Sequence, residues 1–343
     1  MADYEELKKS LLASKKLYED ETFPASEKSL PKFMGELKPA DVVWKRPKEI
    51  CDGKPIFINK DSQYYDVDQG DVMDSWFISL FNCFAVSNKE QFEQVVPQDQ
   101  SFDKEYTGLF RFRFHQDCEM RDVLIDDRLP TVDGKLLFTR NRECPQEMWI
   151  ALLEKAYAKL YGGYEMIACV EPNEVMIDLT GGCAEFIELE WARNDGLVVF
   201  DMLMKLMKNN STLKCLTPVN PEVKEDVLEN GLVAGHGYCI MDVCQAGDNK
   251  LLKLKHPWGD KNKWNGDWSE KSDKWKSVKK DEKTNKKLET GEFWINFESW
   301  LENFMCLVVC HLPTKSTTKS EWHQVAYKGE WKLGSSAGGP MGE

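Results

Sequence analysis

The sequence predicts an α+β protein in two parts, with helices early and strands late. Residues 145–163 carry the clearest helical pattern, because the apolar positions Met148, Leu152 and Ala156 repeat at intervals of four. In the second half, four short apolar runs predict strands. They span residues 237–243, 251–255, 292–297 and 306–312. A chain of 343 residues, of which 42% are hydrophobic, is long enough for two packed domains of roughly 100–200 residues each.

Further helices and strands complete the predicted order. Residues 1–20 carry apolar side chains at the spacing of an amphipathic helix, which predicts a short docking segment. The run after Asp74 is apolar enough for a buried helix, with Asp74 or Ser75 able to cap its first turn. Two strands and one later helix are predicted at residues 109–114, 121–125 and 195–208.

Charge and composition exclude several classes of protein. Asp and Glu outnumber Lys and Arg by 58 to 45, and the net charge of -13 argues against binding nucleic acid or an acidic membrane surface. The same charge is compatible with cations such as calcium. No segment approaches the ~20 apolar residues of a membrane span, and residues 1–10 lack a secretory apolar stretch, so we expect a cytoplasmic location. The 11 cysteines are scattered through apolar runs and predict no disulfide framework.

Two of the five histidines stand at the ends of predicted strands. His236 precedes the strand at 237–243, and His256 follows the strand at 251–255. If these two strands pair, the two imidazoles lie close together. This pair is the first candidate for a functional site.

Four short motifs surround these histidines in a characteristic order. They are Gln69-Gly70, Asp74-Ser75-Trp76, Gly235-His236 and His256-Pro257-Trp258-Gly259. This order resembles the catalytic signature of the calpain family, in which Gln, Cys, His and Asn follow one another. Supporting stretches at 44–51, 123–131, 151–160 and 291–294 extend the resemblance over nearly the whole chain, from Tyr4 to Gly339.

The resemblance implies a papain-like fold of two subdomains with the active site in the cleft between them. Residues 21–168 would carry the nucleophile helix, and residues 169–316 would carry the two histidine strands. Residues 1–20 would form the N-terminal docking helix. Residues 317–343 would form a linker and the truncated start of the β-sandwich domain that follows the core in this family.

The sequence departs from the family at the catalytic positions. Ser75 stands where the resemblance implies Cys, and a serine alcohol cannot form the thiolate that an imidazolium and a helix N-terminus stabilise. His256 stands where Asn would orient the catalytic imidazole of His236. A neutral His256 can still accept a hydrogen bond, but it is larger than Asn and repels His236 when both are protonated.

Other cleft positions are partly retained. Gln69, the implied oxyanion donor, is present, whereas Met73 replaces a glycine two residues before the nucleophile. Trp76 and Trp258 would wall the substrate cleft.

These observations leave three functions open. The leading hypothesis is a catalytically impaired calpain-type pseudoprotease that acts by binding or scaffolding protein partners. The second is a calcium-dependent cysteine endopeptidase, acting on polypeptides, whose nucleophile was engineered to Ser75. The third is a serine-dependent hydrolase that uses Ser75, His236 and His256.

The resemblance also implies two calcium sites outside any EF-hand loop. The first would use the carboxylates of Asp66 and Glu147 with backbone oxygens near Asn59 and Asp61, oxygen donors that suit calcium. The second would use Glu270, Glu292 and the backbone oxygen of Leu288, but Lys263 and Thr290 replace two of its acids. We expect the first site to bind calcium and the second to stay empty.

Overall fold

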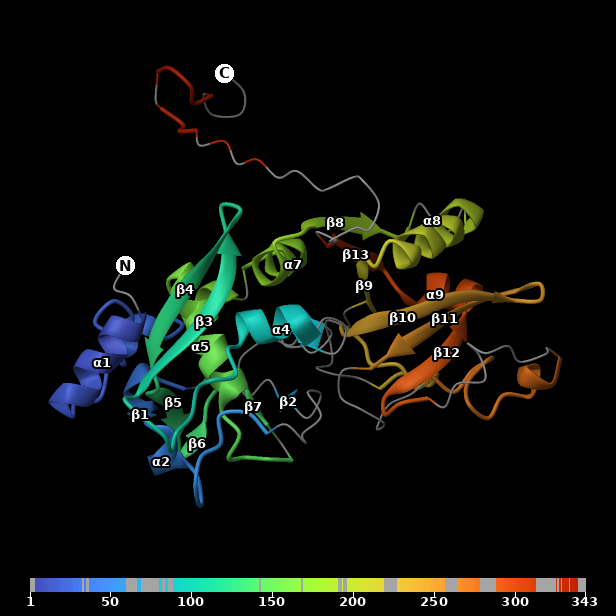
Figure 1. Cartoon of the computed structure of the whole chain (residues 1–343). Coiled ribbons are helices and arrows are strands. Elements are labelled where there is room, and N and C mark those ends of the chain that lie inside the picture. The colour runs from blue at the N-terminus through green and yellow to red at the C-terminus, as the bar shows by residue number, and fades with distance from the viewer. Residues whose placement is uncertain are drawn as a thin grey trace.

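The structure is a computed structural model that describes most of the chain (Figure 1). It describes residues 4–32, 34, 37–59, 67–68, 80–81, 84–85, 89–141, 143–167, 169–190, 193, 196–218, 227–256, 264–277, 288–312, 325, 327, 329–332 and 334–338. Seven of the predicted site residues lie outside these described residues. They are Asp61, Asp66, Gln69, Met73, Ser75, Trp76 and Trp258.

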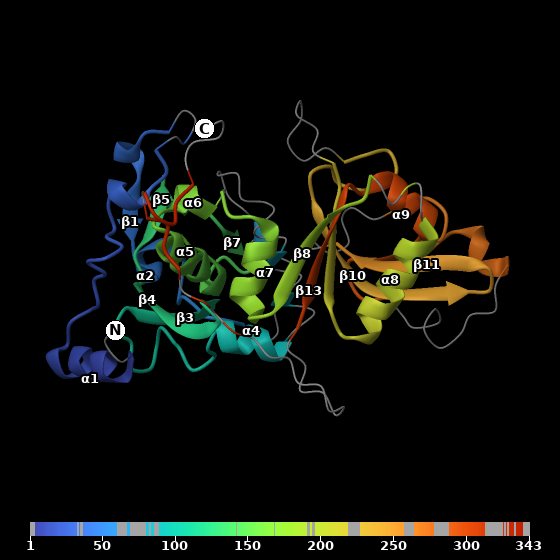
Figure 2. The same ribbon diagram turned by 90° about the horizontal axis from the view of Figure 1, so that it is seen from above.

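The described residues form two bodies that lie side by side (Figures 1 and 2). The first holds most of the helices and several short strands, and the second holds a large antiparallel sheet with helices against it. The predicted α+β class, with helices early and strands late, is confirmed.

The first body is built around the helix α5. Its elements are α1 (Tyr4–Ser14), β1 (Val43–Lys45), α2 (Pro47–Ile50), β2 (Val67–Asp68), α4 (Lys89–Val95), β3 (Leu109–Gln116), β4 (Glu119–Asp126), β5 (Leu129–Val132), β6 (Lys135–Leu136), β7 (Arg140–Asn141), α5 (Trp149–Tyr161), α6 (Tyr164–Ile167) and α7 (Pro172–Thr180). The strands predicted at 109–114 and 121–125 are β3 and β4, which pair as a hairpin.

Helix α5 is buried along most of its length because apolar residues cover most of its surface. Trp149 packs edge-on against Phe92 of α4, with ring centroids 5.2 Å apart. Gly162 ends the helix with φ +92, a left-handed conformation that glycine adopts without strain. The predicted helix over 145–163 therefore ends as expected but begins later, because residues 145–148 form a turn in which Glu147 pairs with Ile56.

The second body is a six-stranded sheet in the order β12-β11-β10-β9-β13-β8, with every neighbouring pair antiparallel. Its elements are β8 (Cys183–Glu188), α8 (Gly196–Lys208), β9 (Thr212–Leu216), β10 (Gly237–Ala246), β11 (Asn249–Lys255), β12 (Glu292–Asn296), α9 (Phe297–Asn303) and β13 (Cys306–His311). The helix predicted at 195–208 is α8, and the four predicted strands are β10 to β13.

The two largest hydrophobic cores correspond to the two bodies, and a smaller cluster includes Trp268 and Trp294. The first includes residues up to Leu179 and returns at Val308, Cys310 and Leu312, and the second begins at Leu189. Helix α7 packs against strand β13 of the second body, since the hydroxyl of Thr180 lies 3.2 Å from the sulfur of Cys310 in β13. The division that we place at residue 168 stays a prediction.

The N-terminal helix α1 rests on the first body through polar and aromatic contacts. The Tyr4 ring is buried and the Arg111 guanidinium lies 4.2 Å from its centroid. Lys8 forms an ion pair with Glu105 at 2.9 Å. None of the helices among the described residues has the length and apolar character needed to cross a membrane.

Cysteine pairing differs from the sequence prediction at one position. Nine described cysteines are free, in agreement with the absence of a disulfide framework. Cys239, however, is disulfide-bonded. It lies in β10, in the ladder between β9 and β11.

Candidate active site

The β10–β11 hairpin positions the histidine pair. His236 directly precedes β10 and His256 directly follows β11, while the turn of the hairpin points away from the first body (Figures 1 and 2). Both histidines therefore lie at the end of the sheet that faces the first body. Their ring centroids are 5.3 Å apart and their planes are inclined by 33°.

Backbone contacts fix the positions of both histidines. The Thr217 hydroxyl accepts a hydrogen bond from the backbone N–H of His236 at 2.9 Å and donates to the carbonyl of Val233 at 2.6 Å. Gly235 precedes His236 with φ +65, a left-handed turn that a side chain would strain. On the other strand, the N–H of His256 donates to the carbonyl of Gly291 at 2.9 Å.

Tyr238 packs against both imidazoles from the core of the second body. Its ring centroid lies 4.9 Å from that of His256 and 6.4 Å from that of His236. Its hydroxyl accepts a hydrogen bond from the backbone N–H of Val233 at 2.8 Å. The aromatic ring thus shields one side of the pair from water.

Burial controls the charge of this pair. The exposed fractions of His236 and His256 are 1% and 0%. Burial lowers the pKa of His256 to about 3. Burial also lowers the pKa of His236 well below its usual range, and the neighbouring His256 and Lys214 lower it further. Both imidazoles are therefore neutral at pH 7.

Lys214 is a residue of this region that the sequence analysis missed. It lies in β9, opposite Cys239 of β10 and Val308 of β13. Its neighbours Leu213 and Cys215 belong to the second core, so alternation places Lys214 on the opposite face of the sheet, where Val308 joins the first core. Its exposed fraction is 1%, and burial lowers its pKa well below its usual range. A single Lys in an apolar strand gives no sequence signal for such a position.

The first predicted calcium site is partly described. Glu147 is buried, and its carboxylate accepts hydrogen bonds from the backbone N–H of Asn59 and from the Asn141 amide, both at 2.5 Å. Asn141 in turn accepts from the N–H groups of Glu143 and Cys144. The structure therefore brings Asn59 and Glu147 together. The hydrogen bonds that Asn141 accepts hold the turn that leads to Glu147.

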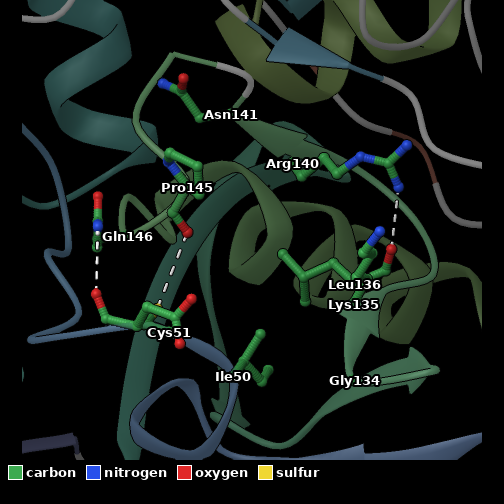
Figure 3. A pocket seen from close by; sticks show the side chains of 10 residues that line it. Ile50, Cys51, Gly134, Lys135, Leu136, Arg140, Asn141, Pro145 and Gln146 are labelled. Carbon is green, nitrogen blue, oxygen red and sulfur yellow. Dashed lines mark hydrogen bonds between the residues drawn. The ribbon is translucent and has the colours of Figure 1, made fainter.

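A cavity of about 470 Å³ lies behind this turn. Figure 3 shows Cys51 and Gln146 along one wall and Arg140 with Leu136 along the other. Dashed lines mark the hydrogen bonds from Gln146 to the Asp52 carbonyl and from Arg140 to the Leu136 carbonyl, at 3.4 and 3.0 Å. Asn141 lines the same cavity and donates a hydrogen bond to Glu147, whereas neither His236 nor His256 is among the lining residues.

Lysines surround the second predicted calcium site. The carboxylate of Glu292, which is 3% exposed, lies 3.3 Å from the Lys253 ammonium and accepts the N–H of Glu289 at 3.0 Å. The Glu289 carboxylate lies 3.1 Å from the Lys255 ammonium. Of the other two predicted ligands, Glu270 is exposed and Leu288 is half-buried. No group of three His, Cys, Asp or Glu side chains gathers as a metal site within the described part of the chain.

Comparisons with known protein sequences assign the chain to a family. Residues 18–311 match the model of the calpain family of cysteine proteases. The chain belongs to the calpain family. It is 37% identical to Calpain-A of Drosophila melanogaster and 38% identical to the Calpain-1 catalytic subunit of Gallus gallus and to Calpain-9 of Mus musculus. Each match covers 98% of this chain but only 42 to 49% of the relative, so the chain spans about half the length of the calpains it matches.

Calpain membership confirms the family resemblance and gives the histidine pair a chemical context. In a cysteine peptidase, the imidazole must become an imidazolium that pairs with the thiolate. In this calpain-family chain the imidazole of His236, which the sequence resemblance predicts to be the catalytic one, is desolvated and faces a second imidazole. Ser75, the predicted nucleophile position, lies outside the described residues.

We predict that both imidazoles of this calpain-family chain stay neutral over the physiological pH range. A histidine whose folded pKa is lowered binds fewer protons than its unfolded counterpart, so the pair destabilises the fold progressively as pH falls below ~6.5. The ring resonances of His236 and His256 in ¹⁵N NMR spectra, assigned with His→Gln variants, should show neutral imidazoles at pH 7 and at pH 5.5. Titration of either ring near pH 6.5 would contradict the burial argument.

Proposed function

We propose that this chain is a catalytically impaired calpain-type protein that binds polypeptides and one calcium ion. The observation that carries the proposal is the replacement of the orienting amide by the imidazole of His256, 5.3 Å from the centroid of His236. The calpain family supplies the expectation of a polypeptide ligand. A cytoplasmic location remains part of the proposal.

The electrostatics of the pair support impaired catalysis. An amide at position 256 could accept a hydrogen bond from an imidazolium at His236 without carrying charge of its own. Burial lowers the pKa of His236, and an imidazole at position 256 lowers that pKa further instead of supporting the imidazolium. Protonated His236 is the form that would stabilise a thiolate, so its loss removes the driving force for forming the nucleophile.

A serine at position 75 adds a second obstacle. An alcohol has no accessible anion near neutral pH, and a serine nucleophile requires a base that accepts its proton during attack. Ser75 and His256 are independent departures from the calpain motif. Engineering at position 75 alone would leave His256 unexplained, which is why we favour natural loss of activity.

The first calcium site fits the ion at its two described residues. A carboxylate oxygen has more than one lone pair, so Glu147 can keep its contacts to Asn59 and Asn141 and still offer an oxygen to calcium. Hard, anionic oxygen ligands are those that calcium prefers. Together with Asp66 and the backbone near Asn59 and Asp61, Glu147 would hold the ion and so fix the 141–147 loop.

The second calcium site does not fit the ion. Lys253 already neutralises the carboxylate of Glu292, and Lys255 neutralises that of Glu289. Calcium would have to displace the ammonium groups of Lys253 and Lys255 from these carboxylates, and Lys263 adds a further positive charge in the sequence. We therefore derive no function from this second site.

Our first functional prediction concerns peptidase activity. The purified chain should not cleave unfolded casein at any calcium concentration, and Ser75→Cys alone should restore little activity because His256 still faces His236. Ser75→Cys combined with His256→Asn should be more active than Ser75→Cys by at least about tenfold, since a correctly oriented general acid–base residue contributes ~10²–10⁴ in rate. Initial rates of casein cleavage provide the measurement.

The control for this experiment is Ser75→Ala, which removes the hydroxyl. Cleavage by the unmodified chain above this control would favour the serine-hydrolase alternative. Activity typical of an isolated calpain core in the Ser75→Cys single variant would show that the nucleophile alone had been removed by engineering.

Our second functional prediction concerns calcium stoichiometry. One ion per chain should bind, because the first site retains both of its predicted carboxylates, whereas Lys263 and Thr290 replace two acids of the second. Calorimetric titration should show loss of binding in Asp66→Ala and in Glu147→Gln. Glu292→Gln is the matched control at the second site, and it should leave calcium affinity unchanged. Two ions of similar affinity, or binding that persists in Asp66→Ala, would contradict the site assignment.

A further inference from the structure

We propose that the cavity of about 470 Å³ in the first body is a binding site for a small aliphatic carboxylate. The inference goes beyond the proposed function, because it involves neither the histidine pair nor a calcium ion. The size of the cavity, its apolar walls and its two cationic side chains together point to this class of ligand.

The cavity is large enough for a small organic molecule. Sites that hold such ligands enclose about 300–1,000 Å³ and combine apolar walls with a few polar groups. Three segments that are distant in the sequence surround this one: the end of α2, the turn between β5 and β6, and residues 140–141 with 145–146 (Figure 3). Different elements of the first body therefore hold its walls apart.

The apolar walls belong to the edge of the first hydrophobic core. Leu136 is part of that core, and the half-buried Ile50 packs against it. Pro145 adds an apolar surface from the third segment (Figure 3). A short hydrocarbon chain that enters the cavity is removed from water by these side chains, and removal from water favours binding of an apolar group.

Lys135 and Arg140 give one side of the cavity a positive charge. Lys135 is exposed and Arg140 is half-buried. The Arg140 guanidinium donates to the Leu136 carbonyl at 3.0 Å, but a guanidinium carries five N–H donors and can keep this contact while it binds a carboxylate. Hydrogen bonds from cationic donors to a carboxylate are roughly twice as strong as those between neutral groups, so this side favours an anion.

Asp52 is the acidic residue that opposes an anion here. Its carbonyl accepts a hydrogen bond from Gln146 at 3.4 Å, which places it on the wall across from Arg140 (Figure 3). Its side chain is exposed. Two cations and one acid among the described lining residues leave the cavity with a net positive charge.

The β5–β6 hairpin fixes the cationic side before any ligand binds. Val132 pairs with Lys135 across a two-residue turn, in which Asp133 and Gly134 have φ +49 and φ +78. Two positive φ values are typical of a type I′ turn, whose twist matches that of the paired strands. The backbone of Lys135 and Leu136 is therefore preorganised, which lowers the entropic cost of binding.

Methyl NMR of the chain, labelled at the Ile and Leu methyl groups, tests the inference without relying on activity. Sodium hexanoate, titrated in the presence of EDTA, should shift the Ile50 and Leu136 resonances and saturate with a millimolar Kd, as expected for so small a ligand. The resonances of Leu254 in the second core should stay in place. Hexanamide, the uncharged control, should bind at least about fivefold more weakly because it accepts no charge-assisted hydrogen bond.

A second pair of probes identifies the source of the carboxylate. N-acetyl-leucine carries the carboxylate of a polypeptide C-terminus, and N-acetyl-leucinamide is its uncharged control. Tighter binding of N-acetyl-leucine than of hexanoate would indicate a chain terminus, and the reverse order would indicate a free acid. Either order supports a carboxylate site, provided that each acid binds more tightly than its amide.

Variants at the two exposed charges sharpen the result. Lys135→Gln should weaken hexanoate binding by at least about fivefold, since it removes a cationic donor. Asp52→Asn should strengthen binding, because it removes the opposing charge. Lys208→Gln, at an exposed lysine of α8 in the second body, is the matched control and should change nothing. Thermal unfolding of each variant checks that it is folded.

Several outcomes would overturn the inference. They are the absence of saturable shifts at Ile50 and Leu136, equal affinity for hexanoate and hexanamide, and unchanged hexanoate affinity in folded Lys135→Gln. These results would leave the casein and calcium predictions intact, because the titration contains no calcium and neither His236 nor His256 lines the cavity. Failure of the casein or calcium prediction would likewise leave this site in place.

Discussion

Burial of two imidazoles at one end of the β10–β11 hairpin is the constraint on which the chemistry of this chain depends. Transfer of an imidazole from water into a protein interior disfavours its protonated form. In a working cysteine peptidase, the thiolate offsets that cost by pairing with the imidazolium. Here His236 is buried beside His256 and near Lys214, two bases that would add positive charge rather than compensate it. The function that we propose follows from this, because the calpain scaffold is retained while burial opposes the protonated state that thiolate chemistry requires.

At the predicted second calcium site, lysine side chains occupy the place that a bound cation would take. Where the calpain resemblance implies a cation bound by acids, Glu292 and Glu289 carry ion pairs with Lys253 and Lys255. The ammonium groups of these two lysines of β11 supply the positive charge that a bound ion would otherwise supply. These ion pairs support our proposal that the second predicted site binds no calcium. The first site differs, because Glu147 contacts the neutral donors Asn59 and Asn141.

Much of the fold could be predicted from local patterns. Helix α5 follows from apolar residues at intervals of four, and β10 to β13 follow from short apolar runs. Strands β8 and β9 were missed because β8 is an exposed edge strand and β9 carries Lys214, so neither has a simple pattern; their pairing with β13 determines them. Helix α7 was also missed, although Pro172 at its start and Gly181 just after its end are signals that could have revealed it. The closeness of His236 and His256 was predictable from strand pairing, whereas burial of Lys214 depends on contact between the two bodies.

The pKa of a thiol introduced by Ser75→Cys tests the central claim most directly. It can be measured from the pH dependence of iodoacetamide alkylation of the peptide containing position 75, quantified by mass spectrometry. If His236 cannot be protonated beside His256, the thiol should keep a pKa at or above the ordinary ~8.5, and alkylation should become slow below pH 7. Adding His256→Asn should then lower that pKa. Rapid alkylation that persists to pH 5–6 in Ser75→Cys alone would demonstrate a thiolate–imidazolium pair and contradict the account.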